Sequence, residues 1–286
     1  MELYKPSTIK YIQDKYGFKL TKSLGQNFLT DKNIIDKIIE GSLIGPEDMV
    51  IEIGPGIGVI TAEAAKAAKK VVAVEIDKTL LPVLEETLAD YPNTKVINND
   101  ILKTDINEII RAEGGKNVKI IGNLPYYITT PIIMKILEDG VEADSITCMM
   151  QKEVADRIKA KPGTKDYGAL SVAVQYYCET VNICNVPKEV FVPKPQVDSA
   201  VLRLDIRKEA VVKIRDKDKF FKVVKAGFGM RRKTLKNSLM GVNGITKDIV
   251  RESLDAAGID PMRRAETLTL GEFAELSDCI AERMKG

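Results

Sequence analysis

The chain has 286 residues, of which 44% are hydrophobic and 29% charged, and its formal net charge is +2. This length suits one large domain with a smaller one, and the composition is that of a globular protein rather than a disordered chain. No apolar run approaches the roughly 20 residues of a membrane span and the first residues do not read as a secretory signal, so we expect a cytoplasmic protein.

Strands and helices are expected to alternate along the first two-thirds of the chain. Apolar spacing predicts a helix over residues 34–44 with Asp31 as its N-cap. Strands are expected at 49–53, 71–76, 95–99, 118–122, 144–150, 181–186 and 200–206, and further helices at 61–68, 80–88, 151–160 and 168–178. This order predicts an α/β fold with a doubly wound, mostly parallel sheet, in which ligands bind at the carboxyl ends of the strands.

The last part of the chain has a different composition. Residues 207–236 carry twelve Lys or Arg and three Asp or Glu, a net charge of +9. We therefore expect one domain over residues 1–206 and a small basic helical domain over 207–286. A basic segment this concentrated favours a polyanionic partner, although a solvated lysine-rich helix is the alternative.

Residue types exclude several chemistries. The chain has no histidine, which removes Ser-His and Cys-His catalysis and imidazole bases. Its cysteines form no C-x-x-C pair, so they are expected to be buried thiols in a reducing compartment and no metal site is expected.

A glycine turn follows the first strand of the sheet. Its glycines, Gly54, Gly56 and Gly58, let the backbone approach a ligand closely, but their G-x-G-x-G spacing differs from the dinucleotide pattern G-x-G-x-x-G. Glu75 lies 21 residues after Gly54 at the end of the next strand, where a carboxylate can bind both ribose hydroxyls. Asp100 follows the third strand and can accept from an adenine amino group. Together these residues predict a nucleoside-bearing cofactor.

Asn123-Leu124-Pro125-Tyr126 follows the strand at 118–122. The Asn123 side-chain oxygen and the Leu124 carbonyl suit the two N–H groups of an exocyclic amine, and Pro125 stiffens the turn. Tyr126 offers a face on which a base can stack, worth about 1–3 kcal/mol. A proline-containing turn with Tyr126 in the core is the alternative.

Residues 52–58, Glu75 and Asp100 resemble the S-adenosylmethionine signature of class I methyltransferases, and residues 25–29 (GQNFL) resemble the N-terminal motif of the rRNA adenine dimethyltransferase family. The resemblance implies S-adenosylmethionine as cofactor and a methyltransferase domain with an N-terminal extension over residues 1–206. The cofactor contacts it implies are Asn27, Leu29, Gly54, Gly56, Glu75, Asp100 and Asn123, with Ile76 and Ile101 lining the adenine pocket. Residues 191–199 (FVPKPQVDS) resemble another motif of the family, which implies that Phe191 is a second stacking face; without the family, a core position is expected for it.

Residues 167–172 and 231–237 resemble the branch of that family that dimethylates N6 of two adjacent adenosines in a hairpin loop of small-subunit (16S) rRNA. The implied partner is this rRNA, or the assembling small subunit, in ribosome biogenesis. Basic residues expected to contact the rRNA are Arg231, Arg232, Lys233 and Lys236. We expect a monomer. Three alternatives stay open: a large-subunit methyltransferase of the macrolide-resistance type, a non-catalytic nucleic-acid-binding assembly factor, and a small-molecule methyltransferase.

Overall fold

The computed structural model describes residues 1–18, 25–230, 232–240 and 244–284, and the chain divides into two units. One comprises Met1–Ala155 with Glu179–Ile206, and the other Asp156–Cys178 with Arg207–Gly286. The chain therefore enters the second unit twice, which differs from the single boundary expected at residue 207. The reason is packing, because Tyr167 and Val172 are buried in the same core as Phe220 and Val223.

A seven-stranded sheet forms the centre of the first unit, in the order β4-β3-β2-β5-β6-β9-β7. Its strands are β2 (Met49–Ile53), β3 (Lys70–Glu75), β4 (Thr94–Asn98), β5 (Val118–Asn123), β6 (Ser145–Gln151), β7 (Cys178–Val186) and β9 (Ser199–Ile206). The strands from β4 to β6 are parallel, whereas β9 is antiparallel to β6. The expected doubly wound, mostly parallel sheet is confirmed. Its winding reverses between β2 and β5, where such sheets open a crevice at their carboxyl ends.

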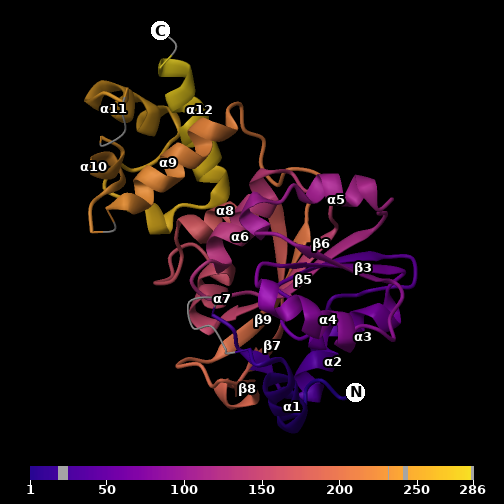
Figure 1. Ribbon diagram of the computed structural model, residues 1–286. Coiled ribbons are helices and arrows are strands. Elements are labelled where there is room, and N and C mark those ends of the chain that lie inside the picture. The colour runs from indigo at the N-terminus through magenta and orange to yellow at the C-terminus, as the bar shows by residue number, and fades with distance from the viewer. Residues whose placement is uncertain (19–24, 231, 241–243, 285–286) are drawn as a thin grey trace. The chain divides into compact units, whose positions relative to one another are not determined.

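Helices cover both faces of this sheet (Figure 1). The side chains of each strand alternate between the two faces. Val50, Val71 and Ile121 belong to the core under α2 (Lys32–Gly41), α3 (Val59–Ala67) and α4 (Leu81–Thr87). On the other face lie α5 (Ile106–Ala112) and α6 (Thr129–Glu138). Asp31 caps α2 as expected, since its carboxylate accepts from the amides of the first turn. With its strands buried from both sides, the sheet exposes mainly its edges and the loops at its strand ends.

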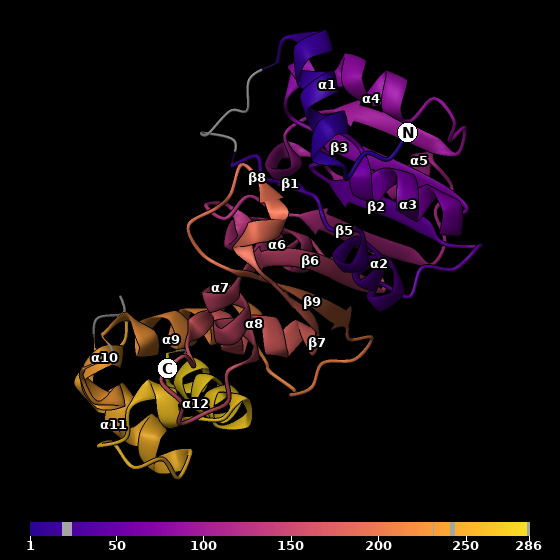
Figure 2. The ribbon, with the colours of Figure 1, turned by 90° about the horizontal axis from the view of Figure 1, so that it is seen from below.

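The N-terminal segment adds two features that the apolar pattern did not predict. Helix α1 (Pro6–Tyr16) lies beside α4, where Lys15 donates to Glu86 at 2.8 Å (Figure 2). Strand β1 (Phe28–Leu29) pairs antiparallel with β8 (Phe191–Val192), forming a separate two-stranded sheet. Residues far apart in the sequence are thereby brought together at the edge of the main sheet.

Helices make up the second unit. They are α8 (Ala169–Tyr177), α9 (Lys217–Gly229), α10 (Leu235–Leu239), α11 (Lys247–Ala256) and α12 (Leu270–Arg283), while α7 (Lys152–Lys159) spans the division between the units. Along α9 the buried residues recur at helical spacing, and its lysines are left toward solvent. Short 3₁₀ turns are η2 (Lys78–Leu80), η3 (Ile101–Lys103), η4 (Lys188–Val190) and η5 (Ala265–Thr267). Among the described helices, none is both long and apolar enough to cross a membrane.

Candidate active site

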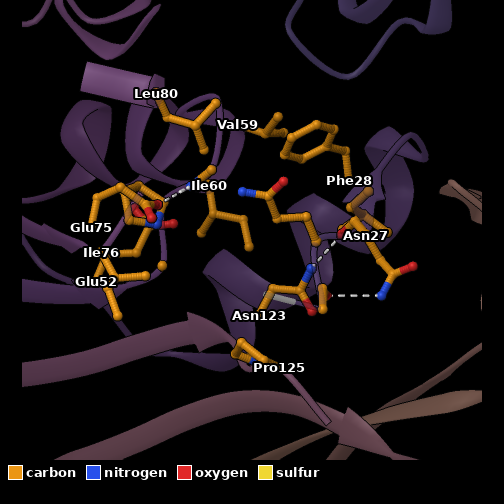
Figure 3. A pocket seen from close by; sticks show the side chains of 16 residues that line it. Asn27, Phe28, Glu52, Val59, Ile60, Glu75, Ile76, Leu80, Asn123 and Pro125 are labelled. Carbon is orange, nitrogen blue, oxygen red and sulfur yellow. Dashed lines mark hydrogen bonds between the residues drawn. The ribbon is translucent and has the colours of Figure 1, made fainter. Parts of the chain in front are cut away.

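A pocket opens at the carboxyl ends of β2, β3 and β5 (Figure 3). Its lining comes from residues 25–29, the end of β2 with the glycine turn and the start of α3, the end of β3 with Leu80, and the turn after β5. The expected site residues that it brings together are Asn27, Leu29, Gly54, Gly56, Glu75, Ile76, Asn123 and Pro125. Residues spread over a hundred positions of the sequence therefore meet around one hollow.

The glycine turn has a backbone that only glycine adopts easily. Gly54 and Gly56 have φ values of 69° and 61°, in the left-handed region. A Cβ atom on Gly56 would lie 2.9 Å from Cε1 of Phe28, closer than carbon atoms pack. The missing side chain thus lets Phe28 cover the turn and keeps the backbone next to the pocket.

Glu75 is held rigidly at the end of β3. Its side chain is buried, its Oε2 accepts from the Gly56 amide at 3.2 Å and its Oε1 accepts from the Asp77 amide at 2.8 Å. Burial raises the pKa of this carboxyl, and the two hydrogen bonds from the backbone amides partly offset the rise. Each carboxylate oxygen has further acceptor capacity, as the binding of two ribose hydroxyls requires.

Glu52, on β2, is a second carboxyl group in the pocket wall, and no role was predicted for it. It is 1% exposed, and its Oε2 has no hydrogen-bond partner among the described residues. Burial raises its pKa to about 8, with a smaller contribution from the charge of Glu75. An unpaired buried acceptor costs free energy unless a ligand satisfies it. A ligand in this pocket that offers Glu52 a hydrogen-bonding group would remove that cost.

Hydrogen bonds hold the segment 25–29 beside the pocket. Gln26 Nε2 donates to Asp77 Oδ2 at 2.7 Å, and the Asn27 carbonyl accepts from Asn123 Nδ2 at 2.8 Å. Leu29, which is buried, pairs with Phe191 in the small sheet. Apolar periodicity contains no signal for these contacts, and only the motif resemblance singled out the segment. Besides Glu52, the residues of the pocket region for which the sequence predicted no role include Gln26, Phe28, Asp77, Val59, Ile60 and Leu80.

The bond to Asn27 fixes the orientation of the Asn123 amide (Figure 3). Because Nδ2 donates to the Asn27 carbonyl, Oδ1 is left as the acceptor for a substrate. In the reverse orientation Oδ1 would face the Asn27 carbonyl oxygen, and the two acceptors would repel each other. The following turn is stiff, because the Leu124 amide donates to Met149 O at 3.2 Å and the Pro125 carbonyl accepts from Thr129 Oγ1 at 2.9 Å. The Leu124 side chain is buried, so its carbonyl alone is a candidate acceptor.

The two aromatic residues expected to stack on a base have different environments. Tyr126 is half-buried, and its hydroxyl lies 2.6 Å from Ser199 Oγ, which holds the ring in place. Burial raises the pKa of Tyr126, so the phenol stays neutral. Phe191 is only 3% exposed and belongs to the core, because the pairing of β8 with β1 turns it inward. In this conformation Phe191 offers no open stacking face, as expected for a core residue rather than for the implied base contact.

A second hollow adjoins the first and shares Gly54, Ile76 and Pro125 with it. It brings in Asp100 and Ile101, the remaining residues expected around an adenine. Asp100 Oδ1 accepts from the Leu102 amide at 3.0 Å, and its Oδ2 lies 3.9 Å from Lys103 Nζ. Among the described residues, Oδ2 has only this distant partner, so it suits a purine amino group.

The expected rRNA contacts lie in the second unit. Arg231 is outside the described residues, Arg232 and Lys233 are exposed, and Lys236 is partly exposed on α10. Their role is not visible in the geometry and remains a prediction.

Comparison with known proteins gives one consistent family. A model of the ribosomal RNA adenine dimethylases matches residues 17–282. A protein of Clostridioides difficile named ribosomal RNA small subunit methyltransferase A is 54% identical over 95% of this chain and 94% of its own length. A protein of the same name from Alkaliphilus metalliredigens is 54% identical over 99% of both chains.

Solved structures agree with this result. A dimethyladenosine transferase from Plasmodium falciparum has a TM-score of 0.75 at 26% identity, covering 87% of this chain and 95% of its own. The 23S rRNA methyltransferase ErmE has a TM-score of 0.66 at 27% identity, covering 88% and 99%. The chain belongs to the ribosomal RNA adenine dimethylase family.

Proposed function

We propose that the protein transfers methyl groups from S-adenosylmethionine to N6 of two adjacent adenosines in a hairpin loop of small-subunit (16S) rRNA, dimethylating each. One observation carries the proposal: Asn123 borders the same pocket as Glu75 and the glycine turn. An amine acceptor and a nucleoside cradle that share one hollow are what transfer to a base requires. The relatives named as small-subunit methyltransferases, 54% identical over nearly the whole chain, favour that subunit over the large one.

The residues present fit this cofactor. When bound, S-adenosylmethionine supplies an electrophilic methyl group on a sulfonium centre. Glu75 would accept from the ribose hydroxyls and Asp100 from the adenine amino group, with Ile76 and Ile101 lining the purine. The unpaired oxygen of Glu52 adds a hydrogen-bonding group for a polar part of the molecule.

Asn123 and Leu124 then orient the acceptor amine. The N6 lone pair of adenine is delocalised into the ring and is a poor nucleophile in that state. Asn123 Oδ1 and the Leu124 carbonyl would accept its two N–H groups and turn the lone pair toward the methyl group, an effect of orientation. The Asn27 carbonyl holds the Asn123 amide for this task. Once it has received the methyl group, the amine nitrogen is positively charged and acidic. It releases its proton to solvent, so the reaction does not need a histidine, which the chain lacks.

An adenosine reaches this site only when it leaves its stack, which hairpin loops allow readily. Tyr126, held by Ser199, would stack on it. Arg231, Arg232, Lys233 and Lys236 are proposed to contact rRNA phosphates, which makes binding weaken as salt increases. We further propose that the protein acts as a monomer in the cytoplasm, on the rRNA of assembling small subunits.

The test uses ribosomal subunits from cells that lack this protein. The purified protein and methyl-labelled cofactor are added to each subunit, and modified adenosines are mapped by mass spectrometry. We expect two adjacent dimethyladenosines in the small subunit. Label confined to the large subunit would instead support the macrolide-resistance activity, and no label in either would favour a non-catalytic assembly factor.

A further inference from the structure

Two consecutive tyrosines follow Pro125, and their environments differ. Tyr126 is half-buried with its hydroxyl bonded to Ser199. Tyr127 is 60% exposed, and within the described part of the chain no hydrogen bond to its hydroxyl is formed. A large ring left in water beside a pocket, with nothing fixing its polar end, is free to pack on a ligand.

The position of Tyr127 indicates which ligand. The ring lines the second hollow together with Ile76 and Ile101. Among the described residues that line this hollow, Asp100 is the one that carries a charge. Its Cε1 lies 3.5 Å from the point where a Cβ of Gly25 would be, so the ring lies next to the segment 25–29 that borders the first pocket. Ile76 is itself 50% exposed at this hollow. Two exposed apolar side chains and one carboxylate therefore surround a space with apolar walls and a single strong acceptor.

We propose that Tyr127 is a binding residue for the purine of the nucleoside cofactor, packing its ring against the base that Asp100 recognises. The inference rests on the proposed function, and it adds a residue that the family motifs did not assign. A purine matches the space, because its flat apolar faces suit the tyrosine and isoleucine side chains and its amino group suits the carboxylate. Because the Tyr127 hydroxyl has no hydrogen-bond partner among the described residues, the ring supplies the affinity for the purine and the hydroxyl contributes little to it.

The test compares Tyr127→Leu with Tyr127→Phe by calorimetric titration with S-adenosylhomocysteine and with 5′-methylthioadenosine, which retains the purine but lacks the amino-acid part. Tyr11→Leu is the matched control, since Tyr11 is 51% exposed on α1 and does not line either hollow. Loss of an aromatic ring that stacks on a base predicts affinity about 5- to 150-fold weaker for Tyr127→Leu with both ligands. Tyr127→Phe and the control should stay within about twofold of the wild type.

Tyrosine emission gives a second readout, because the chain contains no tryptophan. Ligand-induced quenching should be smaller in Tyr127→Leu than in the control. Equal affinities for Tyr127→Leu and wild type would overturn the inference, and a higher KM for rRNA in that variant would then assign the ring to the RNA. Failure of the wild type itself to bind either ligand would refute the proposed function, and this inference with it.

Discussion

Replacing Asn123 with aspartate tests the proposed amine clamp with a change of one atom. Asn123 Nδ2 donates to the Asn27 carbonyl at 2.8 Å, and this bond leaves Oδ1 for the substrate. Asn123→Asp keeps the size of the side chain and its acceptor Oδ1. It replaces the donor Nδ2 by a carboxylate oxygen, which then faces the Asn27 carbonyl oxygen. Loss of such a bond, with one acceptor left unpaired, costs about 1–3 kcal/mol. If the orientation matters chiefly in the transition state, the rate should fall about 5- to 150-fold.

The measurement is single-turnover methyl transfer to small subunits at saturating cofactor, so that weaker cofactor binding does not enter. Asn107→Asp is the matched control. Its amide nitrogen also donates to a backbone carbonyl, that of Gly140 at 3.4 Å, but it lies outside the pocket. The control should react at the wild-type rate. A near wild-type rate for Asn123→Asp, or for Asn123→Ala, would refute the clamp.

Three further predictions concern the pocket walls. Glu75→Ala should raise the dissociation constant of the cofactor at least about 10- to 150-fold in calorimetric titration, since a single hydrogen bond to a charged group contributes about 1.5–3 kcal/mol; an unchanged constant would contradict its role. Tyr126→Ala should slow turnover on rRNA about 5- to 150-fold while cofactor affinity stays constant, because stacking contributes about 1–3 kcal/mol; equal losses in both would point to a structural role. Burial raises the pKa of Glu52 to about 8 from an ordinary 4.5, so the unfolded chain releases a proton that the folded one retains. The stability of the wild type should therefore fall as pH rises between these values, by about 3 kcal/mol from about pH 5.5 to pH 8, and denaturant titration of Glu52→Gln should not show this loss.

The parts of the fold that were predicted from the sequence depend mostly on patterns among residues close together in the chain. The strands ending at Ile53 and Glu75 and the cap at Asp31 depend on neighbours only a few positions away, which is why periodicity and turn chemistry predicted them. The parallel order then followed, since strands separated by helices pair in parallel. Because parallel strands end at one edge, the sequence also predicted that Gly54, Glu75 and Asn123 lie close together.

What only the tertiary structure decided depends on contacts between distant residues. The hydrogen bond from Asn123 to Asn27 joins residues 96 positions apart and chooses the orientation of an amide, which no local pattern encodes. The pairing of β1 with β8 buries Phe191, and the core around Phe220 draws Tyr167 into the second unit. In each case the position of a side chain follows from packing in three dimensions, because burial depends on which segments meet and the order of residues within one segment does not determine that.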